Sequence, residues 1–233
     1  MIDVAVAFAR TELAAIADPA RATPMAAYLK TDMAFYGVTA PLRRRVSGQL
    51  AKRFPPDSRL QYESVVRALW GLAHREEKYL AIDYAERFKV HIVPDSVPLY
   101  RDLIVSGAWW DFVDPVAAHL VGVVLRTRRE VLTPTIVAWG SHDDLWLRRT
   151  ALICQLGHKA DTDVALLFDL CRSLAPEKEF FIRKAIGWAL RDYARTDPDA
   201  VRRFLVDNHD RLSGLSYREA AKHLPDMLEA RRS

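Results

Sequence analysis

The chain has 233 residues, of which half are hydrophobic, and a formal net charge of +4. This apolar fraction excludes a mostly disordered protein, and the length allows a substantial core. No apolar run approaches the roughly 20 residues of a membrane helix, and the amino terminus lacks the basic and apolar regions of a signal peptide. We therefore expect a cytoplasmic protein with a single domain over residues 1–233.

Arginine outnumbers lysine by 26 to 8 among the 34 basic residues. Because the guanidinium fork suits bidentate phosphate contacts, this bias favours a nucleic-acid partner, although a GC-rich genome would produce the same bias. Cys154 and Cys171 show no metal-ligand spacing and are interpreted as buried small apolar residues. The sequence also has no glycine-rich phosphate loop and no paired histidines, so we expect neither a metal nor a nucleotide cofactor.

Helical periodicity runs along the whole chain without sustained two-residue alternation, which predicts an all-α fold. Prolines and glycines separate the periodic segments, as expected for helix starts and stops. The predicted starts include Pro19, Pro24 and Pro198, and the predicted stops are Gly71, Gly107, Gly140 and Gly157.

Aromatic residues recur near the beginnings of helices, at Tyr79, Trp110, Trp146 and Phe181, at intervals of 31, 36 and 35 residues. A period of this length that contains two helices is typical of a helical solenoid, whose concave face is the usual binding surface. The predicted helix pairs cover residues 58–90, 95–126, 129–157 and 161–195.

The helix predicted near residues 177–195 carries a basic stripe around one tryptophan, formed by Lys184, Trp188, Arg191 and Arg195. Such a stripe fits a nucleic-acid backbone, because the cations bind phosphates while the indole packs on sugar or base. In the alternative interpretation, the indole fills a gap between repeats and the basic side chains extend into solvent.

Trp110 and Asp114 are four residues apart, so a helix would place them on one face. Pro115 disfavours helical geometry at Asp114, however. Asp114 could then be only a helix cap, a role for which Asp111 competes.

Four segments resemble the DNA alkylation repair family of HEAT-like-repeat glycosylases, the AlkD type. They are Pro-Met-Ala-Ala-Tyr at 24–28, Trp-Trp-Asp-Phe-Val-Asp at 109–114, Leu-Trp-Leu-Arg-Arg at 145–149, and Lys-Glu-Phe-Phe-Ile-Arg-Lys-Ala-Ile-Gly-Trp-Ala-Leu-Arg at 178–191. The resemblance implies a HEAT-like α–α superhelix with a concave face that binds double-stranded DNA. Because a capped solenoid needs no partner, we expect a monomer, which lies at the nucleoid when bound to DNA.

The resemblance also implies hydrolysis of the N-glycosidic bond of positively charged purines, such as 3-methyladenine and 7-methylguanine. By motif, the catalytic residues would be Asp114, Trp110 and Trp188, and the residues that hold the DNA backbone would be Tyr28, Arg149 and Arg191. The basic stripe adds Lys184 and Arg195 to the expected DNA contacts.

These residue types suit that chemistry, because a charged base leaves without being protonated. Asp114 could stabilise the cationic sugar that develops, and two indole faces would each add about 0.5–2 kcal/mol of cation–π attraction. A non-catalytic protein that binds branched or damaged DNA is one alternative, which the joint presence of Trp110, Asp114, Trp188 and Arg191 disfavours. A protein-interaction scaffold is another, which the basic stripe disfavours.

Overall fold

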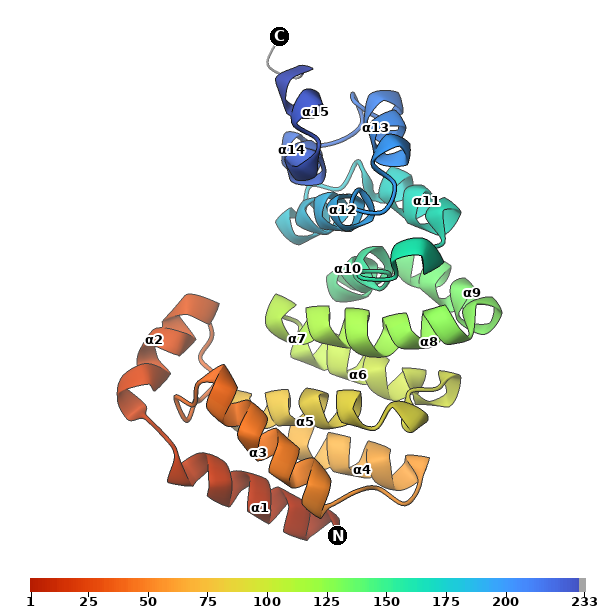
Figure 1. Cartoon of the computed structure of the whole chain (residues 1–233). Coiled ribbons are helices and arrows are strands. Elements are labelled where there is room, and N and C mark those ends of the chain that lie inside the picture. The colour runs from red at the N-terminus through yellow and green to blue at the C-terminus, as the bar shows by residue number, and fades with distance from the viewer. Residues whose placement is uncertain (231–233) are drawn as a thin grey trace. The chain divides into compact units, whose positions relative to one another are not determined.

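The computed structural model describes residues 1–230, and over that range it contains helices and turns but no strand, which confirms the predicted all-α fold (Figure 1). The α-helices are α1 (Ile2–Ala15), α2 (Pro19–Leu29), α3 (Ala40–Arg53), α4 (Arg59–Trp70), α5 (Arg75–Arg87), α6 (Val97–Gly107), α7 (Trp110–Pro115), α8 (Gly122–Thr127), α9 (Arg129–Gly140), α10 (Leu145–Ile153), α11 (Val164–Leu174), α12 (Phe180–Tyr193), α13 (Pro198–Asp207), α14 (Gly214–Ala220) and α15 (Pro225–Ala230). Short 3-10 turns are η1 (Lys89–His91), η2 (Pro94–Ser96), η4 (Lys159–Asp161) and η5 (Ala221–His223), and a π-helical segment, η3 (Val116–Val121), joins α7 to α8.

The chain divides into two compact units, residues 1–99 and residues 100 onward, with the division inside α6. The expectation of a single domain over 1–233 stays a prediction. No helix within residues 1–230 is both long and apolar enough to cross a lipid bilayer.

The predicted helix pairs correspond to α4–α5, α6–α8, α9–α10 and α11–α12. Pro19 and Pro198 occupy the first positions of α2 and α13, as predicted. The prediction that Pro24 starts a helix is wrong, because Pro24 lies inside α2. That helix begins earlier, where the Asp18 carboxylate accepts a hydrogen bond from the Ala20 N–H at 3.1 Å. Both cysteines are buried and free.

In the first unit, a buried carboxylate at the start of α5 fixes the loop between α2 and α3. Glu76 accepts hydrogen bonds from the backbone N–H groups of Tyr36, Gly37 and Val38 at 3.0, 2.9 and 3.0 Å. Charge-assisted bonds of this kind are stronger than neutral ones, so one side chain stabilises a loop that is distant in sequence.

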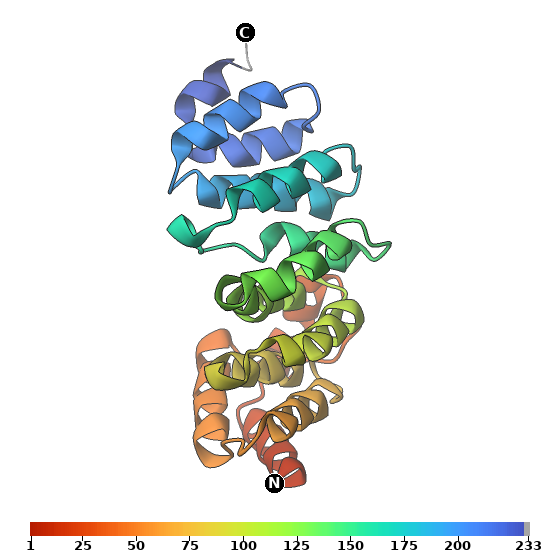
Figure 2. The same ribbon diagram turned by 90° about the vertical axis from the view of Figure 1, so that its right-hand side faces the viewer.

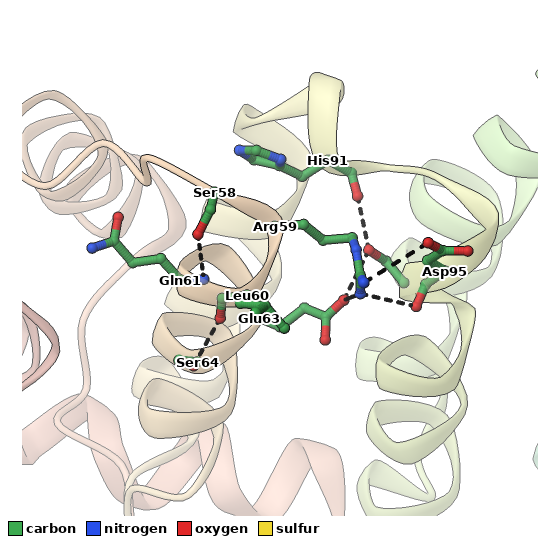
Figure 3. Close-up of polar contacts among 9 residues, drawn as sticks. Ser58, Arg59, Leu60, Gln61, Glu63, Ser64, His91 and Asp95 are labelled. Atoms are coloured by element: carbon green, nitrogen blue, oxygen red, sulfur yellow. Dashed lines mark hydrogen bonds and ion pairs between the residues drawn. The ribbon is translucent and has the colours of Figure 1, made fainter.

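A second network joins the start of α4 to η2 (Figure 3). Arg59 Nη1 lies 2.6 Å from Glu63 Oε1 and 3.3 Å from the carbonyl oxygen of Asp95. The buried hydroxyl of Ser96 donates to the same Glu63 oxygen at 3.1 Å or to the His91 carbonyl at 2.9 Å. These bonds hold the turn that leads into α6 against the start of the preceding helix pair.

In the second unit, successive helices pack into a repeating arrangement (Figure 2). Helix α10 packs on α7 and η3, α12 packs on α10, and α14 packs on α12, whereas α9 and α11 contact each other in a neighbouring layer. Residues on α7, α10, α12 and α14 therefore form one continuous layer of helices.

Two glycines in the second unit, Gly122 on α8 and Gly187 on α12, permit close helix contacts. A Cβ at Gly122 would lie 2.2 Å from the carbonyl oxygen of Cys154, and one at Gly187 would lie 2.4 Å from Glu219 Cβ and 2.7 Å from the Ser216 carbonyl oxygen. All three distances are below van der Waals contact, so any side chain at either position would push two helices apart.

We expect Gly122→Ala to lower the free energy of unfolding by about 1–3 kcal/mol, because the backbone of Cys154 cannot yield without a shift of α10. Gly48→Ala in α3 is the matched control, since a Cβ there meets nothing within 4 Å. It should instead add about 0.5–1 kcal/mol through helix propensity. Urea unfolding of both variants checks this, and equal effects would refute the packing argument.

Candidate active site

Asp114 lies within a helix and is not a helix cap. Trp109 occupies the N-cap position of α7, and the helix continues through Pro115 into the π-helical segment, where the Gly122 N–H donates to the Ala117 carbonyl. Pro115 has no N–H to donate to the carbonyl of Asp111, so the regular hydrogen-bond pattern of an α-helix is already interrupted there. Single wide turns of this kind often occur at functional sites.

A bidentate ion pair fixes the Asp114 carboxylate. Arg149 Nε donates to Asp114 Oδ1 and Arg149 Nη2 donates to Asp114 Oδ2, both at 2.8 Å. Arg149 Nη1 also donates to the carbonyl oxygen of Phe181 at 2.7 Å. One guanidinium therefore connects α7, α10 and the first turns of α12.

The pair is mostly buried, with 13% of the Asp114 side chain and 5% of the Arg149 side chain exposed. Burial raises the pKa of Asp114 above its usual value, while the hydrogen bonds and charge of Arg149 oppose the rise. The carboxylate thus combines a fixed orientation with a small exposed surface.

Three aromatic rings form a cluster, and one of them lies beside the Arg149 guanidinium. The indole of Trp109 packs against Trp146 and Phe181, with ring centroids 6.0 and 5.4 Å apart, and Trp146 lies 4.9 Å from Phe181. The Arg149 guanidinium lies 5.7 Å from the Phe181 ring centroid. Trp146 and Phe181, two of the regularly spaced aromatic residues, therefore pack on each other and on Trp109, the neighbour of Trp110. Trp110 is partly exposed.

Lys184, Trp188 and Arg191 of the basic stripe lie on α12, and Arg195 lies in the turn that follows it. Trp188, Arg191 and Arg195 line one cavity of about 210 Å³. Lys222 and His223, from the end of the α14–η5 segment, and Asp192 complete its lining. Sequence reasoning missed these two residues and Glu219, which pairs with Lys184 and Arg191 at 2.9 and 2.7 Å. No motif marks them, because they lie about 30 residues beyond the stripe and meet it only through helix packing.

Tyr28 lies in the first unit, near the end of α2, with 76% of its surface exposed. Its neighbour Leu29 is the buried residue of that helix. This exposure leaves the Tyr28 ring accessible to a ligand.

Within residues 1–227, whose side chains the structure describes, no group of three or more His, Cys, Asp or Glu side chains could hold a metal ion.

We expect Arg149→Met to lower the free energy of unfolding by about 3–5 kcal/mol, because it leaves the Asp114 charge buried without a partner. Arg172→Met is the matched control, since the Arg172–Asp169 pair is exposed and should contribute at most about 1 kcal/mol. Denaturant unfolding measures both. A loss at Arg149 no larger than that at Arg172 would contradict the proposed burial of this pair.

Comparisons with known proteins are consistent with this arrangement. A family model described as DNA alkylation repair enzyme matches residues 9–224. A solved structure, a predicted DNA alkylation repair enzyme from Enterococcus faecalis, is 33% identical with a TM-score of 0.79, over 89% of this chain and 96% of that one. No curated protein matches the chain. Because the family model and the structural neighbour each span most of its length, this chain belongs to the family of DNA alkylation repair enzymes.

Proposed function

We propose that the protein is a DNA glycosylase that removes purines carrying a positive charge from alkylation at N3 or N7, such as 3-methyladenine and 7-methylguanine. The observation that carries this proposal is the Asp114 carboxylate, which Arg149 holds through both oxygens while part of it stays exposed. A fixed anion of this kind stabilises developing positive charge without having to reorganise.

The reaction breaks the bond between C1′ of the deoxyribose and the purine nitrogen, and the bonding electrons leave with the base. The alkylated base is already cationic, so its departure neutralises it and needs no general acid. Positive charge passes to the sugar, where Asp114 would stabilise it. A water oxygen then bonds to C1′ and loses its proton, which completes the hydrolysis and leaves an abasic site.

Trp110 and Trp188 are the proposed aromatic partners of the sugar. An indole face attracts a cation by about 0.5–2 kcal/mol, and about 1.4 kcal/mol corresponds to a tenfold change in rate. Such modest contributions suit a base that is already a good leaving group. The partial exposure of both side chains is compatible with this role.

The geometry supports an orienting role for Arg149, because only 5% of its side chain is exposed and its donors are directed at Asp114 and the Phe181 carbonyl. A direct contact of Arg149 with the DNA backbone stays a prediction. Phosphate contacts are proposed for the more exposed residues, which are Tyr28, Lys184, Arg191 and Arg195. The proposed partner is double-stranded DNA, and we expect the protein to act on it as a monomer.

We expect Asp114→Asn to abolish release of 7-methylguanine from duplex DNA while binding of that DNA persists. The substitution removes the negative charge and nearly preserves the side-chain shape. Base release, DNA binding and melting temperature are measured in parallel on the wild-type protein and the variant. Binding without release by either would favour a non-catalytic DNA-binding protein, and release by a folded Asn variant would remove Asp114 from the mechanism.

The rate of base release should fall at acid pH as Asp114 becomes protonated. Because burial raises the pKa of this carboxyl, the acid limb should lie above the usual Asp value of about 3.9. The alkylated base keeps its positive charge over this pH range, so the fall in rate at acid pH reports the protonation of a group on the enzyme. A single-turnover pH profile tests this, and a limb at or below pH ~3.9 would contradict the assignment.

A further inference from the structure

Glu219 on α14 binds three basic side chains at once. Its Oε1 lies 2.9 Å from Lys184 Nζ and 2.8 Å from Lys222 Nζ, and its Oε2 lies 2.7 Å from Arg191 Nη1. Only 9% of the Glu219 side chain is exposed, whereas half of the Lys222 side chain is. The carboxylate therefore lies beneath the three cations and does not cover them.

The contact between α12 and α14 places Glu219 there. The absence of a Cβ at Gly187 lets the backbone of α14 approach, since such an atom would lie 2.4 Å from Glu219 Cβ. The Ser216 hydroxyl donates to the Arg183 carbonyl at 3.0 Å, one helical turn before Gly187. Glu219 is thus held on a well-packed helix, which fixes the positions of the side chains that it binds.

The charges around Glu219 do not cancel. Three cations surround one carboxylate, which leaves an excess of two positive charges next to Trp188. Burial opposes ionisation of Glu219, but hydrogen bonds from Lys222 and Lys184 outweigh it and lower the pKa of this carboxyl. The cluster is therefore cationic at neutral pH. It lies beside a cavity of about 210 Å³ whose lining includes Trp188, Arg191 and Lys222, together with Asp192, whose carboxylate accepts a hydrogen bond from the Gly157 N–H.

We propose that Glu219 is a positioning residue that holds Lys184, Arg191 and Lys222 as a preformed site for a phosphate of the DNA backbone, beside Trp188. Long basic side chains lose conformational entropy when they bind a phosphate. A buried carboxylate that has already ordered them reduces this loss. The inference rests on the proposed function only in taking DNA as the ligand, and it adds Lys222 to the DNA-contacting residues.

The Glu219→Gln substitution distinguishes a positioning role of Glu219 from a simple effect of its charge on DNA binding. The substitution raises the net charge by one, so electrostatic attraction alone would strengthen DNA binding. If Glu219 orders the cations, affinity should instead fall about three- to tenfold. Asp210→Asn is the matched control, because it changes the charge equally at a side chain that is 99% exposed and pairs with His209. The control should bind as tightly as the wild-type protein or slightly tighter.

The probe is undamaged duplex DNA, titrated over a range of salt concentrations, with melting temperatures recorded for each variant. Lys222→Gln gives a second variant at a half-exposed side chain. It should weaken binding and lower the log–log salt slope by about 0.9, the value for one lost phosphate contact. In the Glu219→Gln background, Lys222→Gln should reduce the DNA affinity by a smaller factor, because the two residues act together.

Two results would overturn the positioning role. One is that folded Glu219→Gln binds as tightly as Asp210→Asn, and the other is that Lys222→Gln leaves the affinity and the salt slope unchanged. Failure of the proposed function has a different signature, namely a wild-type protein whose binding to duplex DNA is absent or independent of salt.

Discussion

The ion pair between Asp114 and Arg149 is the interaction on which the second unit depends most. Both carboxylate oxygens accept hydrogen bonds from one guanidinium, whose remaining terminal nitrogen reaches the Phe181 carbonyl. Desolvation of two charges is costly, and only good geometry with further hydrogen bonds recovers that cost. The same bonds that join α7, α10 and α12 also determine where the carboxylate points, so stability and the proposed chemistry depend on one contact.

Close helix packing extends this arrangement along the layer formed by α7, α10, α12 and α14. Gly122 and Gly187 allow backbones to approach where a side chain would collide. The first contact supports the helix that carries Asp114, and the second places Glu219 under the basic side chains of α12. Residues far apart in sequence are thereby held on rigid helices, which suits a site that works by fixed electrostatics.

Helix periodicity predicted the all-α fold and the helix pairs, because local sequence controls where helices start and stop. Gly71, Gly107 and Gly140 mark the ends of α4, α6 and α9 as predicted, but the predicted stop at Gly157 is wrong, because α10 already ends at Ile153. The basic stripe was also recognisable from the sequence, because Lys184, Trp188 and Arg191 occupy positions i, i+4 and i+7, which share one face of a helix. The Arg149 bond to Asp114 was not predictable from either segment, because it spans 35 residues and arises from packing. Glu219 and Lys222 were missed for the same reason. Pro24 and Pro115 show that a proline inside a helix can be mistaken for a boundary.

The account attributes base release to a fixed anion acting on a base that already carries a positive charge, without a general acid. The most direct test compares the release of 7-methylguanine with that of hypoxanthine, a neutral purine, from the same position in duplex DNA under single-turnover conditions. The account predicts release of 7-methylguanine well above its spontaneous rate and none of hypoxanthine. Comparable release of both bases would contradict it, because a neutral purine must be protonated as it leaves.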